Sequence, residues 1–272
     1  MKKWMYGILY GLVLAFLLVV VGYEVLVTKN FDTGFFLKAG LCAVALITSI
    51  LKVFVKPVRA SSNRRALYRK AYAEFLEGAF NDDKKLEKKL LDALEAYNQE
   101  KYAATLDILN KLQPQCMRSS DRYAVTVFQA LCCHDMNLFQ DAIRYYEAAL
   151  LIRPNTKLAS NQGMCYEKTG DYEAASKAYH RAAQLDPQNA SAFNNMAQMC
   201  MRIGEYEYAL KYAALAYERN QKLVPALNAL AVCNYMLGNQ KEYEHWYRQA
   251  VASGSDPSKI KAYIASLDPS LS

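Results

Sequence analysis

Seven cysteines and three histidines are the side chains best suited to chemistry, and the stretch LCCHD at residues 131–135 holds three of them in a row. Thiolates and imidazoles bind zinc when they converge on one point. Consecutive helical residues point about 100° apart, so Cys132, Cys133 and His134 cannot share one ion. The chain also has no glycine-rich phosphate loop, nucleophile elbow or HExxH motif. We expect no catalytic residue, no metal site and no cofactor, and the chain is predicted not to be an enzyme.

Position along the chain explains three of the cysteines. Cys132, Cys165 and Cys233 occupy equivalent places in successive segments, and Met199 takes that place in the segment between them. The place therefore requires a modest apolar side chain rather than sulfur chemistry. The recurrence also shows that the chain contains an internal repeat.

The repeat is clearest in GMCYEKTGDYEAASKAYHRAAQLDP, residues 163–187. Gly163 and Tyr166 lie on one predicted helix, Ala175 and Tyr179 lie on the next, and Pro187 ends the second helix. This spacing resembles the tetratricopeptide repeat, a 34-residue helix–turn–helix unit. The resemblance implies an α-solenoid, in which each helix pair buries its apolar face against its neighbours.

The same register extends in both directions. We expect four units at about 123–155, 156–189, 190–223 and 224–256, with Ala197 and Ala209 in the places of Gly163 and Ala175. A degenerate unit is predicted at 86–122, preceded by a connecting helix. Residues 257–272 are predicted to form a capping helix and tail that covers the exposed end of the stack.

Contact between a small and a large side chain is the physical basis of this prediction. A Gly or Ala on the first helix of a unit lets an aromatic ring from the second helix lie against the backbone, so the helices approach closely. We expect this pairing in unit after unit. The fold class is predicted to be all-α, with no strand in the repeat region.

Two apolar segments precede the repeats. The segments at about 4–27 and 35–55 are each long enough to cross a bilayer. Lys38 and Lys52 lie near the two ends of the second segment, where their side chains can reach the lipid headgroups. We predict a transmembrane helical hairpin over residues 1–56. The alternatives are a cleaved signal peptide for the first segment and an amphipathic helix on the bilayer surface for the second.

Charge is concentrated at the front of the chain. Residues 1–70 hold 11 lysines and arginines against two acidic residues, a net charge of +9, whereas the remainder holds 22 against 24, a net charge of −2. Because the repeats are not basic, nucleic acid is not expected as a partner. The basic juxtamembrane segment within 57–85 is predicted to attract anionic lipid headgroups.

The same charges predict topology, because basic flanks stay in the cytoplasm. Lys2 and Lys3 precede the first apolar segment and six basic residues follow the second, whereas the turn between the segments holds only Lys29. Both termini and the repeats are therefore predicted to be cytoplasmic, at the plasma membrane.

The resemblance implies that a protein or peptide partner binds in a groove lined by the first helix of each unit. No small-molecule substrate is expected. Amide side chains can bond an extended peptide backbone, and Met and Tyr offer adaptable apolar contact. The groove candidates are Val127, Leu131, His134, Asp135, Ser160, Met164, Glu167, Lys168, Asn194, Gln198, Met201, Arg202, Asn228, Val232, Tyr235 and Met236.

Some members of this family clamp a terminal carboxylate with lysine and asparagine. Lys157, Asn161 and Asn195 resemble part of that set, but Asn228 and Ala229 stand where a further basic residue is expected. We therefore predict a membrane-anchored scaffold or adaptor that binds its partner by other contacts. The alternative is a non-catalytic subunit of a membrane enzyme or transport complex.

Overall fold

The structure is a computed structural model that describes residues 65–267. The chain divides into two units, Met1–Leu67 and Tyr68–Ser272, and the second contains nearly all of the described residues. The predicted hairpin over 1–56 lies outside the described range. Within 65–267, no helix combines the length and apolar character needed to cross a membrane.

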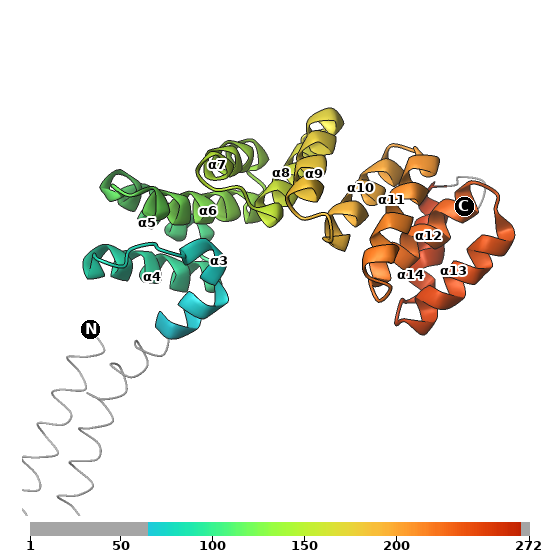
Figure 1. Ribbon diagram of the computed structural model, residues 1–272, viewed down its shortest axis with the longest axis horizontal. Helices are drawn as coiled ribbons and strands as arrows, with labels where there is room; N and C mark the ends of the chain where they lie inside the picture. The colour runs from blue at the N-terminus through green and yellow to red at the C-terminus, as the bar shows by residue number, and fades with distance from the viewer. Residues whose placement is uncertain (1–64, 268–272) are drawn as a thin grey trace, which may run out of the picture. The chain divides into compact units, whose positions relative to one another are not determined.

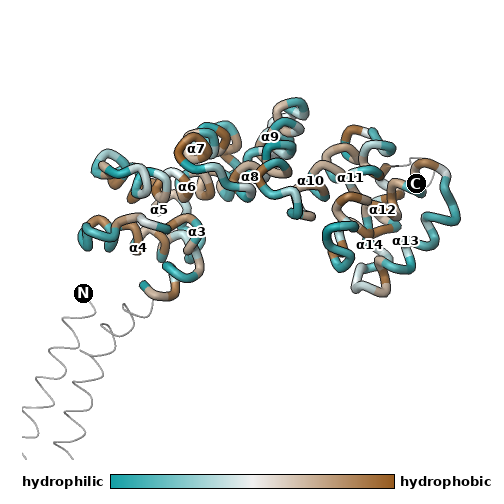
Figure 2. The backbone as a smooth tube through the Cα atoms, in the orientation of Figure 1, coloured by the Kyte–Doolittle hydropathy of each residue, from teal (hydrophilic) through white to brown (hydrophobic). Residues whose placement is uncertain are grey.

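The described part of the chain contains helices and no strand, as predicted (Figure 1). Figure 2 shows hydrophobic and hydrophilic positions recurring within the helices, the pattern of helices that bury one face. After a short helical lead at 65–71, the elements are α3 (Ala73–Leu76), α4 (Lys84–Asn98), α5 (Tyr102–Leu112), a 3₁₀ turn (Gln113–Gln115), α6 (Ser119–Asp135), α7 (Phe139–Ile152), α8 (Thr156–Lys168), α9 (Tyr172–Leu185), α10 (Ala190–Arg202), α11 (Tyr206–Arg219), α12 (Val224–Met236), α13 (Gln240–Ala252) and α14 (Pro257–Leu267).

Helices from α4 to α13 form antiparallel pairs. The first helix of a pair ends at a residue with positive φ, which reverses the chain in a few residues. Gly170 has this conformation after α8 (φ +81°), and Asn137 has it after α6 (φ +58°), where a small polar side chain tolerates the left-handed region. Each second helix also contacts the first helix of the next pair, so the pairs form a continuous stack.

The contact between Gly163 on α8 and Tyr179 on α9 sets the spacing of this pair. A Cβ atom placed on Gly163 would lie 2.6 Å from Cε1 of the Tyr179 ring, closer than real Cβ atoms approach other atoms. Tyr179 is 1 % exposed, so the ring has no free space into which it could retreat. The absent side chain at Gly163 is thus what lets the tyrosine pack against the helix backbone.

The small–large pairing does not occur in every unit, contrary to expectation. Tyr146 is fully buried in the first unit, but Ala213 occupies the equivalent place in the third, where Ala197 is also buried. The surrounding core is built from sulfur-containing side chains of α10, namely Met196, Met199, Cys200 and Met201. Flexible thioethers adapt to irregular space, which explains how the stack continues without the ring.

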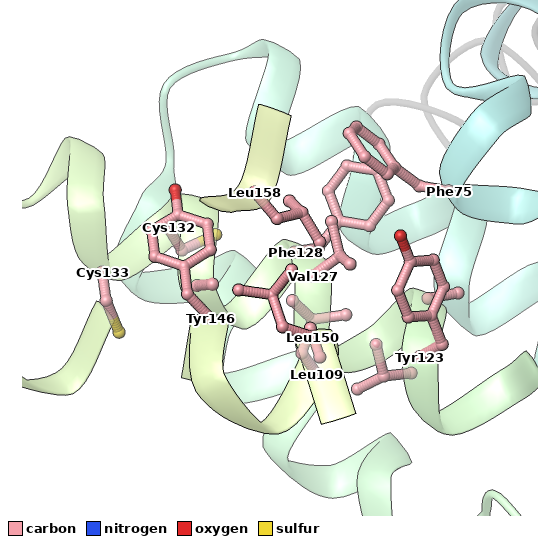
Figure 3. Packing of buried hydrophobic residues seen from close by; sticks show 14 of the residues in the cluster. Phe75, Leu109, Tyr123, Val127, Phe128, Cys132, Cys133, Tyr146, Leu150 and Leu158 are labelled. Atoms are coloured by element: carbon pink, nitrogen blue, oxygen red, sulfur yellow. The ribbon is translucent and has the colours of Figure 1, made fainter. Parts of the chain in front are cut away.

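A second core lies around α6 (Figure 3). We call residues 68–83, which precede α4, the leading segment. Phe128 is fully buried, and Tyr72 and Phe75 of the leading segment meet its ring edge-on at centroid distances of 5.0 and 6.3 Å. Edge-to-face packing of this kind adds stabilisation beyond the burial of area. The segment before the first pair is therefore fixed to α6 by aromatic contacts.

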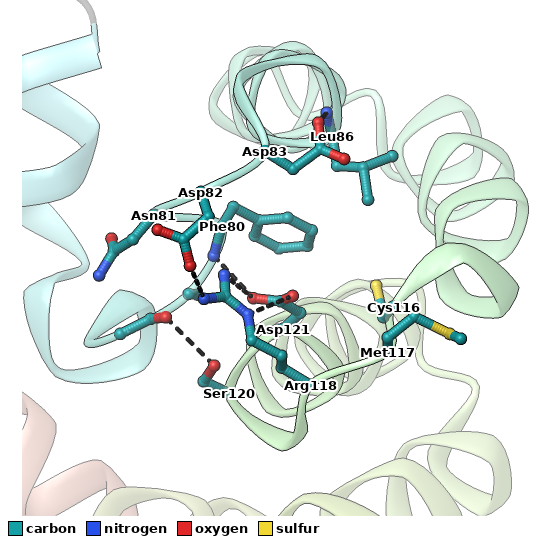
Figure 4. A network of polar contacts seen from close by, with 12 residues as sticks. Phe80, Asn81, Asp82, Asp83, Leu86, Cys116, Met117, Arg118, Ser120 and Asp121 are labelled. Carbon is teal, nitrogen blue, oxygen red and sulfur yellow. Dashed lines mark hydrogen bonds and ion pairs between the residues drawn. The ribbon is translucent and has the colours of Figure 1, made fainter.

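Polar contacts hold the same leading segment (Figure 4). The Phe80 amide donates to Asp121 Oδ1 over 2.7 Å, and Arg118 donates to both oxygens of that carboxylate over 3.2 Å. Arg69, predicted as part of the lipid-attracting cluster, instead pairs with the buried carboxylate of Glu87 at 2.6 Å. Its guanidinium is therefore committed to the fold.

We expect Gly163→Ala to destabilise the protein by about 1–2 kcal/mol, because overpacking against the Tyr179 ring outweighs the roughly 1 kcal/mol that alanine normally gains over glycine in a helix. Thermal unfolding measures the change. Combining the substitution with Tyr179→Leu should cost less than the sum of the two single changes. A higher melting temperature for Gly163→Ala alone would contradict the close contact.

Candidate partner-binding face

The first helices α8, α10 and α12 lie side by side, since α8 contacts α10 and α10 contacts α12. We call the side of these helices that carries the predicted groove residues the first-helix face. Its accessible or half-buried members are Ser160, Met164, Lys168, Asn194, Gln198, Arg202, Asn228, Tyr235 and Met236. The structure therefore places these predicted residues on three neighbouring helices.

Four predicted groove residues are buried instead, namely Val127, Met201, Val232 and Glu167, the last of which is described with its partners below. Val127 is fully buried in the cluster that contains Phe75 and Phe128 (Figure 3). Met201 and Val232 are 1 % and 2 % exposed. The helical register placed them on the partner-facing side, but it could not show that other segments of the chain cover them. They contribute to the core and not to an open surface.

Of the three remaining candidates of the first unit, Leu131 and His134 are half-buried and Asp135 is exposed. The His134 ring packs near Phe139 and Tyr146, at centroid distances of 6.2 and 6.4 Å, and Leu131 borders the core. Asp135 accepts a hydrogen bond of 2.6 Å from Tyr97 of the preceding pair. These side chains mainly join neighbouring helices.

The leading segment uses one predicted carboxylate-clamp residue. Lys157 Nζ lies 2.6 Å from Glu74 Oε1, 83 residues earlier in the chain. Arg153 donates to the backbone carbonyls of Glu74 and Glu77 over 3.2 Å, and its guanidinium lies 4.3 Å from the Tyr123 ring centroid. Lys157 is thus already paired with a carboxylate of the same chain, which argues against a clamp for the terminal carboxylate of a partner.

A buried carboxylate lies at the end of α8. Tyr179 Oη donates to Glu167 Oε1 over 2.6 Å, and Arg202 Nη1 lies 2.9 Å from Glu167 Oε2. The Glu167 side chain is 4 % exposed, whereas that of Arg202 is 46 % exposed. Both carboxylate oxygens are satisfied, so this charge is buried without an unpaired atom. The contact joins α8 and α9 to α10 of the next pair.

The environment of Tyr179 also fixes its protonation. Burial raises the pKa of its hydroxyl far above the ordinary value, and the hydrogen bond to the Glu167 carboxylate raises it further. The hydroxyl therefore stays protonated and remains a donor. Arg202, predicted as a free groove residue, has one face committed to this network and presents only the remainder to a partner.

A hollow of about 180 Å³ lies at the C-terminal part of the first-helix face. Its walls come from α10, α12 and α14, and α14 contributes Lys259, Ile260 and Tyr263. The sequence predicted that residues 257–272 cover the free end of the stack. Among the described helices, α14 contacts principally α12, so it covers part of the first-helix face. The other lining residues are Gln198, Met201, Asn228, Ala229 and Val232.

Two amide side chains on this face are not satisfied by the protein. Asn194 Oδ1 and Asn228 Oδ1 are buried atoms with no hydrogen-bond partner among the described residues. Asn194 and Asn228 occupy equivalent positions on α10 and α12. An unpaired buried polar atom costs about 1–3 kcal/mol, so a partner group that forms a hydrogen bond with either amide would recover part of this free energy.

The residues predicted to pack the second and third units lie where packing requires. Gly163, Ala175, Ala197 and Ala209 are buried, Tyr166 is half-buried between the two core clusters, and Pro187 is exposed after α9. Sequence reasoning missed Lys259 and Tyr263 as groove residues. Their apolar neighbours Ile260 and Ile264 signalled a buried helix face, but not which surface it would meet.

The cysteines of the folded region are buried. Burial raises the pKa of Cys132 to about 12 and of Cys133 to about 11, so both thiols are protonated and poorly reactive at neutral pH. Within residues 65–267, no three metal-ligating side chains are placed to hold an ion.

Comparison with known proteins identifies the repeats. A TPR repeat model matches residues 165–204, and a tetratricopeptide repeat model matches residues 127–156. The chain therefore contains tetratricopeptide repeats, and neither model describes a catalytic family. No curated protein sequence matches the chain.

Solved structures show the same fold. A tetratricopeptide repeat protein from Parabacteroides merdae aligns with a TM-score of 0.60 and 18 % identity over 67 % of this chain and 72 % of its own. MamA aligns with a TM-score of 0.55 and 14 % identity over 62 % and 92 %. YrrB, described as a TPR protein with an unusual peptide-binding site, aligns with a TM-score of 0.54 and 15 % identity over 70 % and 96 %.

We expect Glu167→Ala to destabilise the protein by about 2–4 kcal/mol, because the substitution leaves the buried Tyr179 hydroxyl and one face of Arg202 unpaired. Thermal unfolding of Glu167→Ala and of Tyr179→Phe, alone and together, measures the coupling. Glu173→Ala is the control, because Glu173 pairs with Lys177 at the exposed surface of α9 and should leave the melting temperature unchanged. Equal effects of the two alanine substitutions would contradict the structural role of Glu167.

Proposed function

We propose that this tetratricopeptide repeat protein is a membrane-anchored scaffold that binds a protein or peptide partner on its first-helix face. The observation that carries the proposal is the accessible surface across α8 and α10, where Met164 is 36 % exposed beside polar neighbours. Exposed apolar side chains with a polar surround are typical of binding surfaces.

The chemistry of this surface favours a partner segment that offers hydrogen-bonding side chains beside apolar ones. Asn194, Gln198 and Asn228 supply amides from two neighbouring helices, and the unpaired Asn oxygens are stabilised when the amides turn toward a donor. Met164 offers a flexible apolar contact of the kind used for varied partners. The peptide-binding site named for YrrB supports the same use of a related fold.

Membrane anchoring is part of the proposal. The uncharged stretch at residues 4–23 and the apolar stretch at 35–55 support a transmembrane hairpin, with the basic residues on either side placing both termini and the repeats in the cytoplasm. Basic residues of the juxtamembrane segment other than Arg69 would contact anionic headgroups. Confinement to the membrane raises the local concentration of the repeats for partners at the same surface.

A photoreactive amino acid at position 164 tests the binding surface. In intact membranes, we expect it to crosslink to a partner protein, because Met164 is an exposed apolar residue of the first-helix face. Position 185 is the matched control, since Leu185 is 41 % exposed but belongs to the second helix α9. The same adducts from both positions would contradict the proposed surface.

Cysteine labelling tests the topology. In a Cys42→Ser background, we expect Thr33→Cys to react with an impermeant maleimide added outside the cell, and Ser62→Cys to remain unlabelled. The buried, protonated cysteines of the repeats should give little background. Labelling only at position 62 would invert the predicted orientation, and labelling at neither position in cells, but at both after lysis, would contradict the hairpin.

A further inference from the structure

We propose that α14 is a tethered ligand of the first-helix face, and that the partner is an amphipathic helix with an acidic polar side that displaces it. The inference rests on the proposed function, because it specifies the partner and the regulation of the same surface. The three residues that α14 contributes to the hollow lie opposite predicted groove residues of α10 and α12. The last helix of the chain therefore occupies part of the surface assigned to a partner.

The apolar residues of α14 show which spacing this surface accepts. Ile260 and Ile264 are each 3 % exposed, and Leu267 packs against the same cluster, which also contains Met201 and Val232. Together with Tyr263, which lines the hollow, they follow the i, i+3, i+4, i+7 pattern of helices that bind in grooves. A partner helix with this pattern can make the same contacts.

The attachment of α14 is slight compared with that of the helix beneath it. Two of its eleven residues are buried, whereas eight of the thirteen residues of α12 are buried. Terminal elements with few buried apolar contacts open at a lower free energy than the core. The helix can therefore leave the face while α10 and α12 remain folded.

Charge distinguishes α14 from a better ligand. Of the three basic residues on α8, α10 and α12, Lys157 pairs with Glu74 and Arg202 pairs with Glu167, while Lys168 is exposed at the end of α8. The sequence of α14, PSKIKAYIASL, adds two more lysines and no acidic residue. A helix with the same apolar residues and carboxylates on its polar side would be attracted where α14 is repelled.

A labelled peptide of residues 255–267 is the probe. By fluorescence anisotropy, we expect it to bind the full-length Ile260→Ser/Ile264→Ser variant at least about tenfold more tightly than the wild-type chain. In the wild-type protein, the tethered helix covers the surface in most molecules, so only a small fraction of them can bind the peptide. A peptide with Lys259→Glu and Lys261→Glu should bind more tightly still, with a difference that shrinks as salt is added. The Ala262→Ser/Ser266→Ala variant alters exposed positions of α14 and should behave as wild type.

Hydrogen exchange of the wild-type chain gives a second measurement. We expect amides of α14 to exchange faster than those of α10 and α12. Failure of the peptide to bind a folded Ile260→Ser/Ile264→Ser variant would overturn the inference, as would protection of α14 equal to that of α12. Because the peptide assay needs no cellular partner, such a failure beside intact crosslinking at position 164 would reject the tethered ligand and leave the proposed function standing.

Discussion

No helix pair in this protein can bury its apolar face alone, and the closeness of the packed helices depends on where a side chain is missing. At Gly163, a single additional carbon atom would collide with the Tyr179 ring at 2.6 Å. The ring lies flat against α8 only because that carbon is absent. Each second helix can then contact the next first helix, and α8, α10 and α12 come to lie side by side. The side-by-side arrangement of these three helices is thus a consequence of core packing.

The polar network around Glu167 depends on the same contact. With the ring held against α8, the Tyr179 hydroxyl reaches the carboxylate, whose other oxygen meets Arg202 of the next pair. A buried ionic contact of this kind adds little net stability compared with an apolar substitute, but an unpaired member is costly. The network joins the end of α8 to the end of α10, the two helices that carry Met164 and Gln198.

The sequence predicted the features that depend on local spacing. Helix pairing and the approach of Tyr179 to Gly163 follow from residues 16 positions apart within one repeating unit. The docking of α3 and α14 could not be predicted in this way, because it depends on which distant surface completes the burial of their apolar residues. The pair Lys157–Glu74, 83 residues apart, shows the difficulty. Ala213 marks another limit, because an alanine stands where the two preceding units carry a tyrosine, and the repeat pattern does not show that this core cluster contains three methionines of α10.

The two flanking segments also determine how much of the first-helix face a partner can reach. The leading segment commits Lys157, and α14 covers the C-terminal part beside Asn228. Neighbouring packed helices lie about 8–10 Å apart, so the uncovered strip across α8 and α10 is only about one interhelical spacing wide. A strip of that size supports weak contact, because few side chains offset the loss of freedom on binding. Release of α14 would add the surface of α12 and the hollow beside it. In the proposed mode of binding, a partner that binds tightly has to engage the region that α14 covers, so displacement of the terminal helix would set the extent of the binding face.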